Sequence, residues 1–198
     1  MGANLVIPHG YDLIGTQMPW WLVISCRNRW YLKTFVEGGA GYGDTSAIAC
    51  EHFAKVFAIE VVPDVYRAQR KELISSPKAT RLLGTTECHL PDLVKAIDTP
   101  TLWYLDSHWP GMGAKLGPEC PLLNEIDILM SRNSLPHDVI LIDNAGLFFK
   151  PPPPPHAVSE WPSIGQVADA MHRACRGMSI QFFCDIIIAT PEPLWGTI

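Results

Sequence analysis

Residues 34–46, TFVEGGAGYGDTS, decide the fold of this chain. Two apolar residues suited to a buried strand precede Glu37, and glycines follow at positions 38, 39, 41 and 43. Because glycine adopts positive φ and lets a backbone approach a ligand closely, this run predicts a tight turn after the strand. Three residues that can cap a helix come next: Asp44, Thr45 and Ser46. The stretch therefore predicts a strand, a glycine loop and a helix N-terminus, with which α/β sheets hold nucleotide-like ligands.

A second apolar stretch, residues 56–61 (VFAIEV), predicts the next strand and carries an acid, Glu60, near its end. A carboxylate at that place can accept hydrogen bonds from both hydroxyls of a ribose. The glycine loop and this acid together predict an adenosine-containing ligand.

The spacing from Glu37 to Gly43, E-x-G-x-G-x-G, resembles motif I of class I S-adenosylmethionine-dependent methyltransferases. A dinucleotide-binding loop would instead read G-x-G-x-x-G, and the residue three beyond Gly41 is Asp44. The resemblance implies that S-adenosylmethionine is the cofactor and that the loop binds its amino-acid end. The cofactor-binding residues that it implies are Glu37, Gly39, Gly41, Tyr42, Gly43, Thr45, Glu60, Val61, Thr85, Thr86 and Asp106.

Composition narrows the class of protein. The chain has 198 residues, of which 47% are hydrophobic and 18% charged, as expected for one compact domain. A net charge of −5 and the lack of a Lys/Arg run argue against a nucleic-acid partner and against an anionic membrane partner. No secretory signal and no membrane-spanning run of about 20 apolar residues is visible, so we predict a cytoplasmic protein. Six widely spaced cysteines without a C-x-x-C pair are typical of reduced, mostly buried thiols.

Strands and helices alternate along the chain. The predicted strands are 34–37, 56–61, 81–84, 101–106 and 139–143, followed by two edge strands within 180–190 that pair antiparallel. The predicted helices are 44–54, 63–73, 90–97, 121–130 and 163–176, the last capped by Ser163. This order predicts an α/β fold with a doubly wound, mainly parallel sheet. The C-terminal hairpin fits the antiparallel seventh strand of methyltransferase sheets, so the resemblance implies a seven-stranded, Rossmann-like fold.

Residues 34–198 are predicted to form a single cofactor-binding domain, and residues 1–33 a helical cover. Pro19 is expected as the first helical residue of that cover. Its aromatic side chains are apolar enough to pack on the sheet or on another subunit, which would make a homodimer, and they could also line a substrate mouth.

Two further segments each allow two interpretations. Residues 109–120 form either a lid or substrate loop or a plain connection. The five prolines at 151–155 form a stiff polyproline II spacer or a partner-docking segment.

Acids end the fourth and fifth predicted strands, as Asp106 and as Asp143, which Asn144 follows. A carboxylate at the end of an apolar strand is costly unless it is hydrated, hydrogen-bonded or bound to a metal. Neighbouring strand ends lie on the same rim of a sheet, so these three side chains offer oxygen ligands suited to Mg²⁺ or another divalent cation. A plain turn after the fifth strand is the alternative for Asp143 and Asn144.

The segments Asp106-Ser107-His108-Trp109 and Leu141-Ile142-Asp143-Asn144 resemble the two metal-binding segments of catechol-type, cation-dependent O-methyltransferases. The resemblance implies divalent-metal-assisted methylation of a hydroxyl on a small molecule or a sugar. Pro110 stands where those enzymes carry the lysine that acts as general base. The catalytic candidates are therefore His108, as base or as a packing residue, and Asp106. Two alternatives remain, a module that binds S-adenosylmethionine or a nucleoside without methyl transfer, and a nicotinamide-dependent oxidoreductase.

Overall fold

The computed structural model describes residues 18–109, 115–150 and 152–194. These residues form one seven-stranded sheet in the order β3-β2-β1-β4-β5-β7-β6. The strands are β1 (Thr34–Gly38), β2 (Lys55–Glu60), β3 (Ala79–Leu83), β4 (Thr101–Leu105), β5 (Val139–Ile142), β6 (Ser179–Phe183) and β7 (Ile186–Thr190). The helices are α1 (Trp20–Arg29), α2 (Asp44–His52), α3 (Pro63–Arg67), α4 (Lys71–Ser75), α5 (Thr86–Ala96), α6 (Leu122–Met130), α7 (Gly146–Phe149) and α8 (Ile164–Ala174), with 3-10 turns η1 (Leu135–His137) and η2 (Val158–Glu160).

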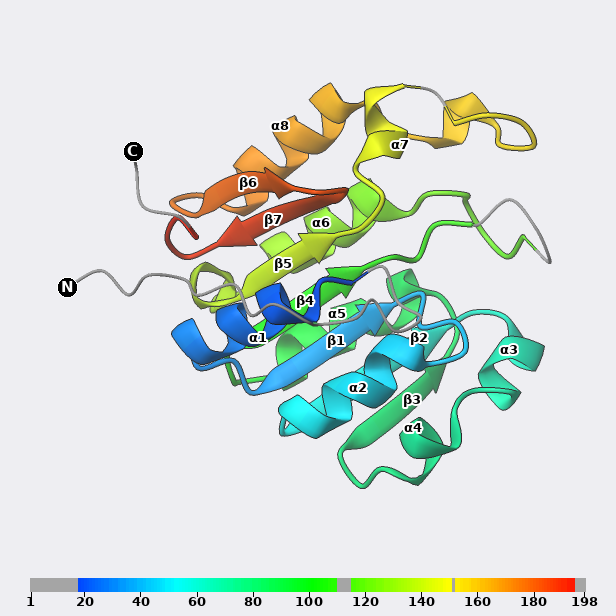
Figure 1. Ribbon diagram of the computed structural model, residues 1–198. Helices are drawn as coiled ribbons and strands as arrows, with labels where there is room; N and C mark the ends of the chain where they lie inside the picture. The colour runs from blue at the N-terminus through cyan, green and yellow to red at the C-terminus, as the bar shows by residue number, and fades with distance from the viewer. Residues whose placement is uncertain (1–17, 110–114, 151, 195–198) are drawn as a thin grey trace.

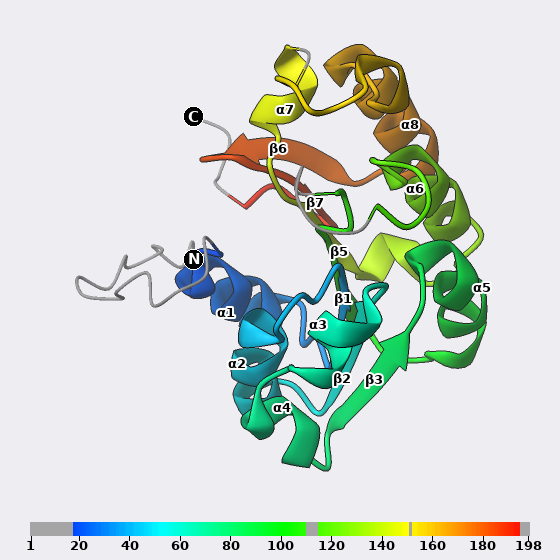
Figure 2. The ribbon, with the colours of Figure 1, turned by 90° about the vertical axis from the view of Figure 1, so that its right-hand side faces the viewer.

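The sheet has two covered faces, as Figures 1 and 2 show. Helices α1, α2 and α4 lie on one face, and α5, α6 and α8 lie on the other. Alternate residues of the central strands enter opposite cores, because successive side chains of a strand point to opposite faces. In β5, for example, Leu141 packs in the core under α1 and α2, whereas Ile140 and Ile142 pack in the core under α6 and α8. Strands buried on both faces explain the continuous apolar runs in the sequence.

The predicted fold class, a mainly parallel seven-stranded sheet with an antiparallel C-terminal hairpin, is confirmed. Strands β1 to β5 pair in parallel, while β7 runs antiparallel to both β5 and β6. One detail was wrong. Strand β7 is an interior strand with every residue buried, so of the two C-terminal strands only β6 lies at the edge of the sheet.

The helix predicted over 63–73 is two short helices, α3 and α4, separated at residues 68–70. Tertiary contacts interrupt it. The backbone N–H of Arg70 donates to the carbonyl of Tyr42 at 2.8 Å, and the Gln69 side chain donates to the carbonyl of Gly41 at 3.0 Å. Both bonds fasten the glycine loop, and a continuous helix would not provide them.

Helix α5 begins elsewhere than expected, and helix α2 begins at the predicted Asp44 but without the expected side-chain cap. Helix α5 starts at Thr86, one turn before the predicted residue 90, because the Thr85 hydroxyl accepts the N–H of Cys88 and caps it. Helix α2 is preceded by Gly43 in the left-handed region and has no side-chain cap. The expected capping side chains are otherwise engaged, since Asp44 pairs with Arg70 and Ser46 donates to Glu37.

The described part of the N-terminal segment is α1, which Pro19 precedes as N-cap rather than opens. Its Leu22, Val23 and Cys26 are buried in the core of the same chain, so the helix covers the sheet. A homodimer through this segment stays a prediction, and residues 1–17 lie outside the described residues. In the described part of the proline run, 152–155, the Pro154–Pro155 peptide bond is cis, unlike the all-trans bonds of polyproline II, and the N–H of His156 donates to the carbonyl of Pro153 in a turn. No helix among the described residues has the length and apolar character that a bilayer crossing needs.

Candidate functional site

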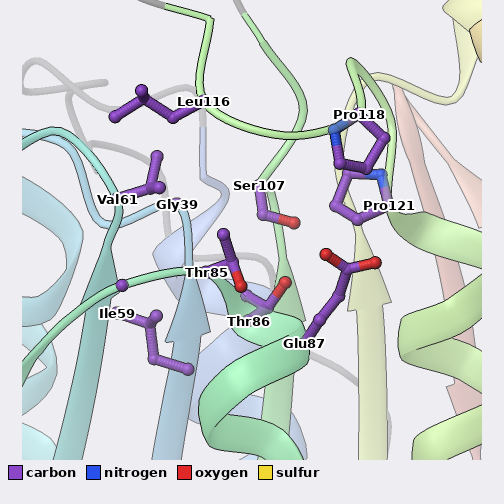
Figure 3. Close-up of a pocket in the computed structure, with 11 residues that line it drawn as sticks. Gly39, Ile59, Val61, Thr85, Thr86, Glu87, Ser107, Leu116, Pro118 and Pro121 are labelled. Carbon is purple, nitrogen blue, oxygen red and sulfur yellow. The ribbon is translucent and has the colours of Figure 1, made fainter.

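A pocket opens at the carboxyl ends of the parallel strands (Figure 3). Residues from the ends of β1 to β4 and from the start of α5 line one side, and residues that follow β4 in the chain line the other. The lining residues are Gly39, Ile59, Val61, Gly84, Thr85, Thr86, Glu87, Ser107, Leu116, Pro118 and Pro121. Ligands of doubly wound sheets bind at this edge.

The glycine loop depends on Gly39 for a close backbone contact. Gly39 has φ +79°, and a Cβ built on it would lie 2.1 Å from the carbonyl oxygen of Asp106. Only glycine therefore lets the loop cross directly over the end of β4. At Gly41, with φ +53°, a Cβ would have no atom within 4 Å, so this side of the loop faces open space.

The carboxylate of Glu60 forms hydrogen bonds with the glycine loop and with a residue that follows β2. One oxygen of its carboxylate accepts the N–H of Gly41 at 2.8 Å, and the other accepts the N–H of Val62 at 2.7 Å. The side chain that the sequence assigned to a ribose thus already organises the loop. Glu60 is buried and is not among the residues that line the pocket, so its contact with a ribose stays a prediction.

Glu37 does not line the pocket. It is buried at the end of β1, where the hydroxyl of Ser46 donates to it, and burial raises the pKa of Glu37 to about 8. Thr45 also contributes a hydrogen bond that partly opposes this shift. The pair of Glu37 and α2 therefore fixes the strand-to-helix connection behind the glycine loop.

Thr45 and Asp106 do not line the pocket, and the other remaining predicted cofactor residues fall into two groups. Val61, Thr85 and Thr86 line the pocket with Gly39, as expected. Tyr42 is exposed and, with Gly41 and Gly43, belongs to the loop beside it.

Three hydrogen bonds beside the pocket were not visible in the sequence. The hydroxyls of Thr86 and Ser107 both donate to Oε1 of Glu125, a buried carboxylate in the first turn of α6. Asn124 of the same helix donates to Glu87 at 2.9 Å. An acid inside an apolar helical pattern carries no signal of its own, so only the packing of α5 against α6 reveals these contacts.

Asp106 and His108 lie together after β4, with Nδ1 of His108 3.5 Å from Oδ1 of Asp106. Burial, and then the neighbouring Asp143, raise the pKa of Asp106 well above its usual range. Burial lowers the pKa of His108 despite the opposing effect of Asp143. The ring of His108 also packs 5.4 Å from that of Trp161. His108 therefore packs on an aromatic ring and contacts an acid, and its role as general base stays a prediction.

Asp143 and Asn144 follow β5 on the same rim. One Asp143 oxygen accepts the hydroxyl of Tyr104 at 2.8 Å, and Asn144 turns the chain with φ +55°. Among the described residues, no three His, Cys, Asp or Glu side chains form a metal-binding group. The donor set itself suits a hard cation, however, because Asp106 and Asp143 are close enough to interact and neither forms an ion pair with a described Lys or Arg.

A second, smaller hollow lies between the ends of β4 and β5. Ser107, His108, Glu125 and Asp143 contribute its polar lining, and its apolar lining is Leu105, Cys120, Pro121, Leu122, Ile142 and Phe148. It shares Ser107 and Pro121 with the first pocket, so the two are neighbours on the rim.

No family model and no curated protein matches this sequence. Solved structures do match. A candidate O-methyltransferase of Klebsiella pneumoniae has a TM-score of 0.62 at 13% identity, over 93% of this chain and 83% of its own. The methyltransferase PaMTH1 of Podospora anserina, solved with bound SAH (S-adenosylhomocysteine), has a TM-score of 0.58 at 17% identity, over 86% and 76%. A candidate methyltransferase of Streptococcus mutans, in complex with SAH, has a TM-score of 0.56 at 12% identity, over 87% and 97%. At these identities the likeness establishes the fold, and this chain has the fold of class I S-adenosylmethionine-dependent methyltransferases.

Proposed function

We propose that this protein is an S-adenosylmethionine-dependent methyltransferase that methylates a hydroxyl of a small molecule or a sugar. The observation that carries the proposal is the glycine loop after β1, which adjoins a pocket at the carboxyl ends of β2, β3 and β4 in a sheet of methyltransferase order. Two of the structural neighbours were solved with SAH, the product form of this cofactor.

Each part of the cofactor has a matching group on this rim. The backbone of the glycine loop would bind the amino-acid end, and Glu60 the ribose hydroxyls. Thr85 and Thr86 would adjoin the adenine. The positively charged sulfonium and ammonium groups of a bound cofactor would favour the ionised form of Asp106, which follows β4 on the same rim.

Methyl transfer needs an acceptor oxygen in line with the sulfonium methyl group. The oxygen forms the new O–CH₃ bond, the C–S bond breaks with its electron pair staying on sulfur, and the hydroxyl proton passes to a base. We propose His108 as that base and Asp106 as the residue that orients it. Nδ1 of His108 faces Asp106, which leaves Nε2 to accept a proton.

Divalent-metal assistance belongs to the same proposal. Asp106, Asp143 and Asn144 would hold the ion, which when bound lowers the pKa of a coordinated hydroxyl. The support is the oxygen-only donor set and the lack of a described Lys or Arg partner for either acid.

A nicotinamide-dependent oxidoreductase fits less well, because the dinucleotide-binding order 3-2-1-4-5-6 has no antiparallel strand inserted after strand five. A module that binds S-adenosylmethionine without transferring its methyl group remains the second candidate, favoured by Pro110 in place of a base lysine.

Calorimetry separates these functions. We expect S-adenosylmethionine and SAH to bind and NAD not to bind, each titrated with and without Mg²⁺. NAD binding without S-adenosylmethionine binding would refute the proposal. Incubating S-adenosylmethionine with phenols, catechols and sugars, and detecting SAH, then distinguishes an enzyme from a binding module.

A further inference from the structure

A buried carboxylate with no role in the proposed chemistry lies beside both hollows. Glu119 is only 2% exposed, although it follows a Gly-Pro turn in the long connection after β4. Trp161 Nε1 donates to it at 2.8 Å, the N–H of Ala157 donates to both of its oxygens at 3.0 and 3.1 Å, and Nδ1 of His156 lies 3.2 Å away. Burial opposes its ionisation, but these hydrogen bonds lower the pKa of Glu119 to about 2. The carboxylate is therefore ionised and bound to groups about 40 residues further along the chain.

Residues 115–121, which we call the roof segment, contain Glu119 and three residues that line the first pocket: Leu116, Pro118 and Pro121. Figure 3 shows these three side chains across the pocket from Ile59 and Thr86. The roof segment has a second attachment, because Glu160 accepts the N–H of Glu119 at 2.9 Å and the ammonium group of Lys115 at 2.6 Å. The backbone carbonyl of Glu119 also accepts a hydrogen bond from the N–H of Trp109 at 2.7 Å.

Trp161, the hydrogen-bond partner of Glu119, contacts two residues that line the second hollow. Trp161, which donates to Glu119, packs 5.4 Å from the ring of His108 and 6.2 Å from that of Phe148. His108 and Phe148 both line the second hollow. One carboxylate thus connects the roof of the first pocket to the aromatic wall of the second.

We propose, on the basis of the proposed function, that Glu119 is a positioning residue that holds the roof segment over the adenosine part of the cofactor. Leu116 and Pro118 are held opposite Val61 and Thr85, where we expect the adenine. Glu119 reaches the cofactor only through these side chains, which it positions by hydrogen bonds to the 156–161 segment.

Three variants test the proposal, with adenosine and SAH as calorimetric probes at a temperature where every variant is folded. In Glu119→Gln one oxygen is replaced by an NH₂ group that faces N–H donors, so the charged acceptor is lost. We expect both probes to bind about tenfold more weakly, because part of the binding free energy would then be spent on ordering the roof segment. In Leu116→Ala, at a residue 44% exposed, the fold should persist and both probes should bind about threefold more weakly or worse. Glu192→Gln is the matched control, because the side chain of Glu192 forms only an exposed ion pair with Arg29 among the described residues, and the substitution leaves its backbone contact with Thr190 unchanged.

A purely structural role would lower the melting temperature of Glu119→Gln and leave both dissociation constants at the parental value, which would overturn the proposal. The proposal would also be overturned if Glu119→Gln bound the probes more weakly while Leu116→Ala bound them with the parental dissociation constants. The roof segment would then not touch the ligand. If Glu119→Gln fails to fold, Leu116→Ala still tests the proposal, because parental dissociation constants in that variant would overturn it. In both refuting outcomes the parent binds SAH, so the proposed function stands. If the parent binds neither probe, both proposals fall together.

Discussion

Replacing Gly39 or Gly41 by alanine gives a matched pair of perturbations in the glycine loop. Both residues have positive φ, which costs a residue with a Cβ about 1–2 kcal/mol. Alanine recovers about 0.4–1 kcal/mol of this by restricting the unfolded chain. For Gly41→Ala nothing else is added, because a Cβ there meets no atom within 4 Å, and we expect a net loss of about 1 kcal/mol.

Gly39→Ala adds a steric collision. The new Cβ would lie 2.1 Å from the carbonyl oxygen of Asp106, 2.6 Å from its carbonyl carbon and 2.8 Å from Cα of Ser107. All three are backbone atoms at the end of β4, so relief requires either β4 or the loop to shift. Overpacking of this kind costs about 1–3 kcal/mol, which brings the expected total to about 2–4 kcal/mol.

Urea unfolding at 25 °C measures both losses, and calorimetry with SAH adds a functional readout. We expect Gly39→Ala to lose both stability and SAH binding, because it displaces Asp106 and Ser107. Gly41→Ala should keep most of its stability but bind SAH more weakly, because its methyl group points into the open side of the loop. Equal destabilisation by the two substitutions would refute the close contact between the loop and β4.

Four further predictions follow from the site. Glu60→Ala should weaken S-adenosylmethionine binding by about 1–3 kcal/mol, as expected when hydroxyls and a loop N–H lose a charged partner; an unchanged dissociation constant would remove Glu60 from the site. His108→Ala should lower turnover by about 10²–10⁴-fold with cofactor affinity intact, whereas a lower melting temperature at normal turnover would mean that it only packs on Trp161. Asp143→Ala should abolish Mg²⁺-dependent activity without loss of cofactor affinity, and a chelator should reproduce the effect in the parent; activity that survives chelation would contradict the metal site. Burial raises the pKa of Glu37 to about 8, so the folded state binds its proton more tightly than the unfolded state and stability should fall as the pH rises from about 4.5 to 8. Glu37→Gln should flatten this dependence in urea titrations at several pH values, and an unaltered slope would show that Glu37 is not its source.

Local chemistry made much of the fold readable from the sequence. The apolar runs of β1, β2, β4 and β5 identify strands buried on both faces, and the glycines after Glu37 can follow a strand only as a turn. The acids Asp106 and Asp143 were expected on one rim because parallel neighbouring strands end at the same edge, and the pairing of Leu105 with Ile142 places the two acids there. These features depend on residue type, period and chain order, all of which a sequence contains.

Other features depend on which segments meet, and only the tertiary structure decided them. Gln69 and Arg70 end a helix because the carbonyls of the glycine loop lie beside them. At the opposite end of the sheet, the buried Arg132 pairs with Asp138 at 2.5 Å and donates to Thr99 at 2.8 Å, an arrangement that nothing in its local sequence indicates. Glu119 and Trp161 likewise form a hydrogen bond across 42 residues. The sequence by itself determined the strands, the glycine loop and the acids of the rim, because those follow from local backbone preferences and periodicity. The partners of the buried polar groups were decided by the packed fold, since a buried charge must be satisfied by whichever donors that fold brings within reach.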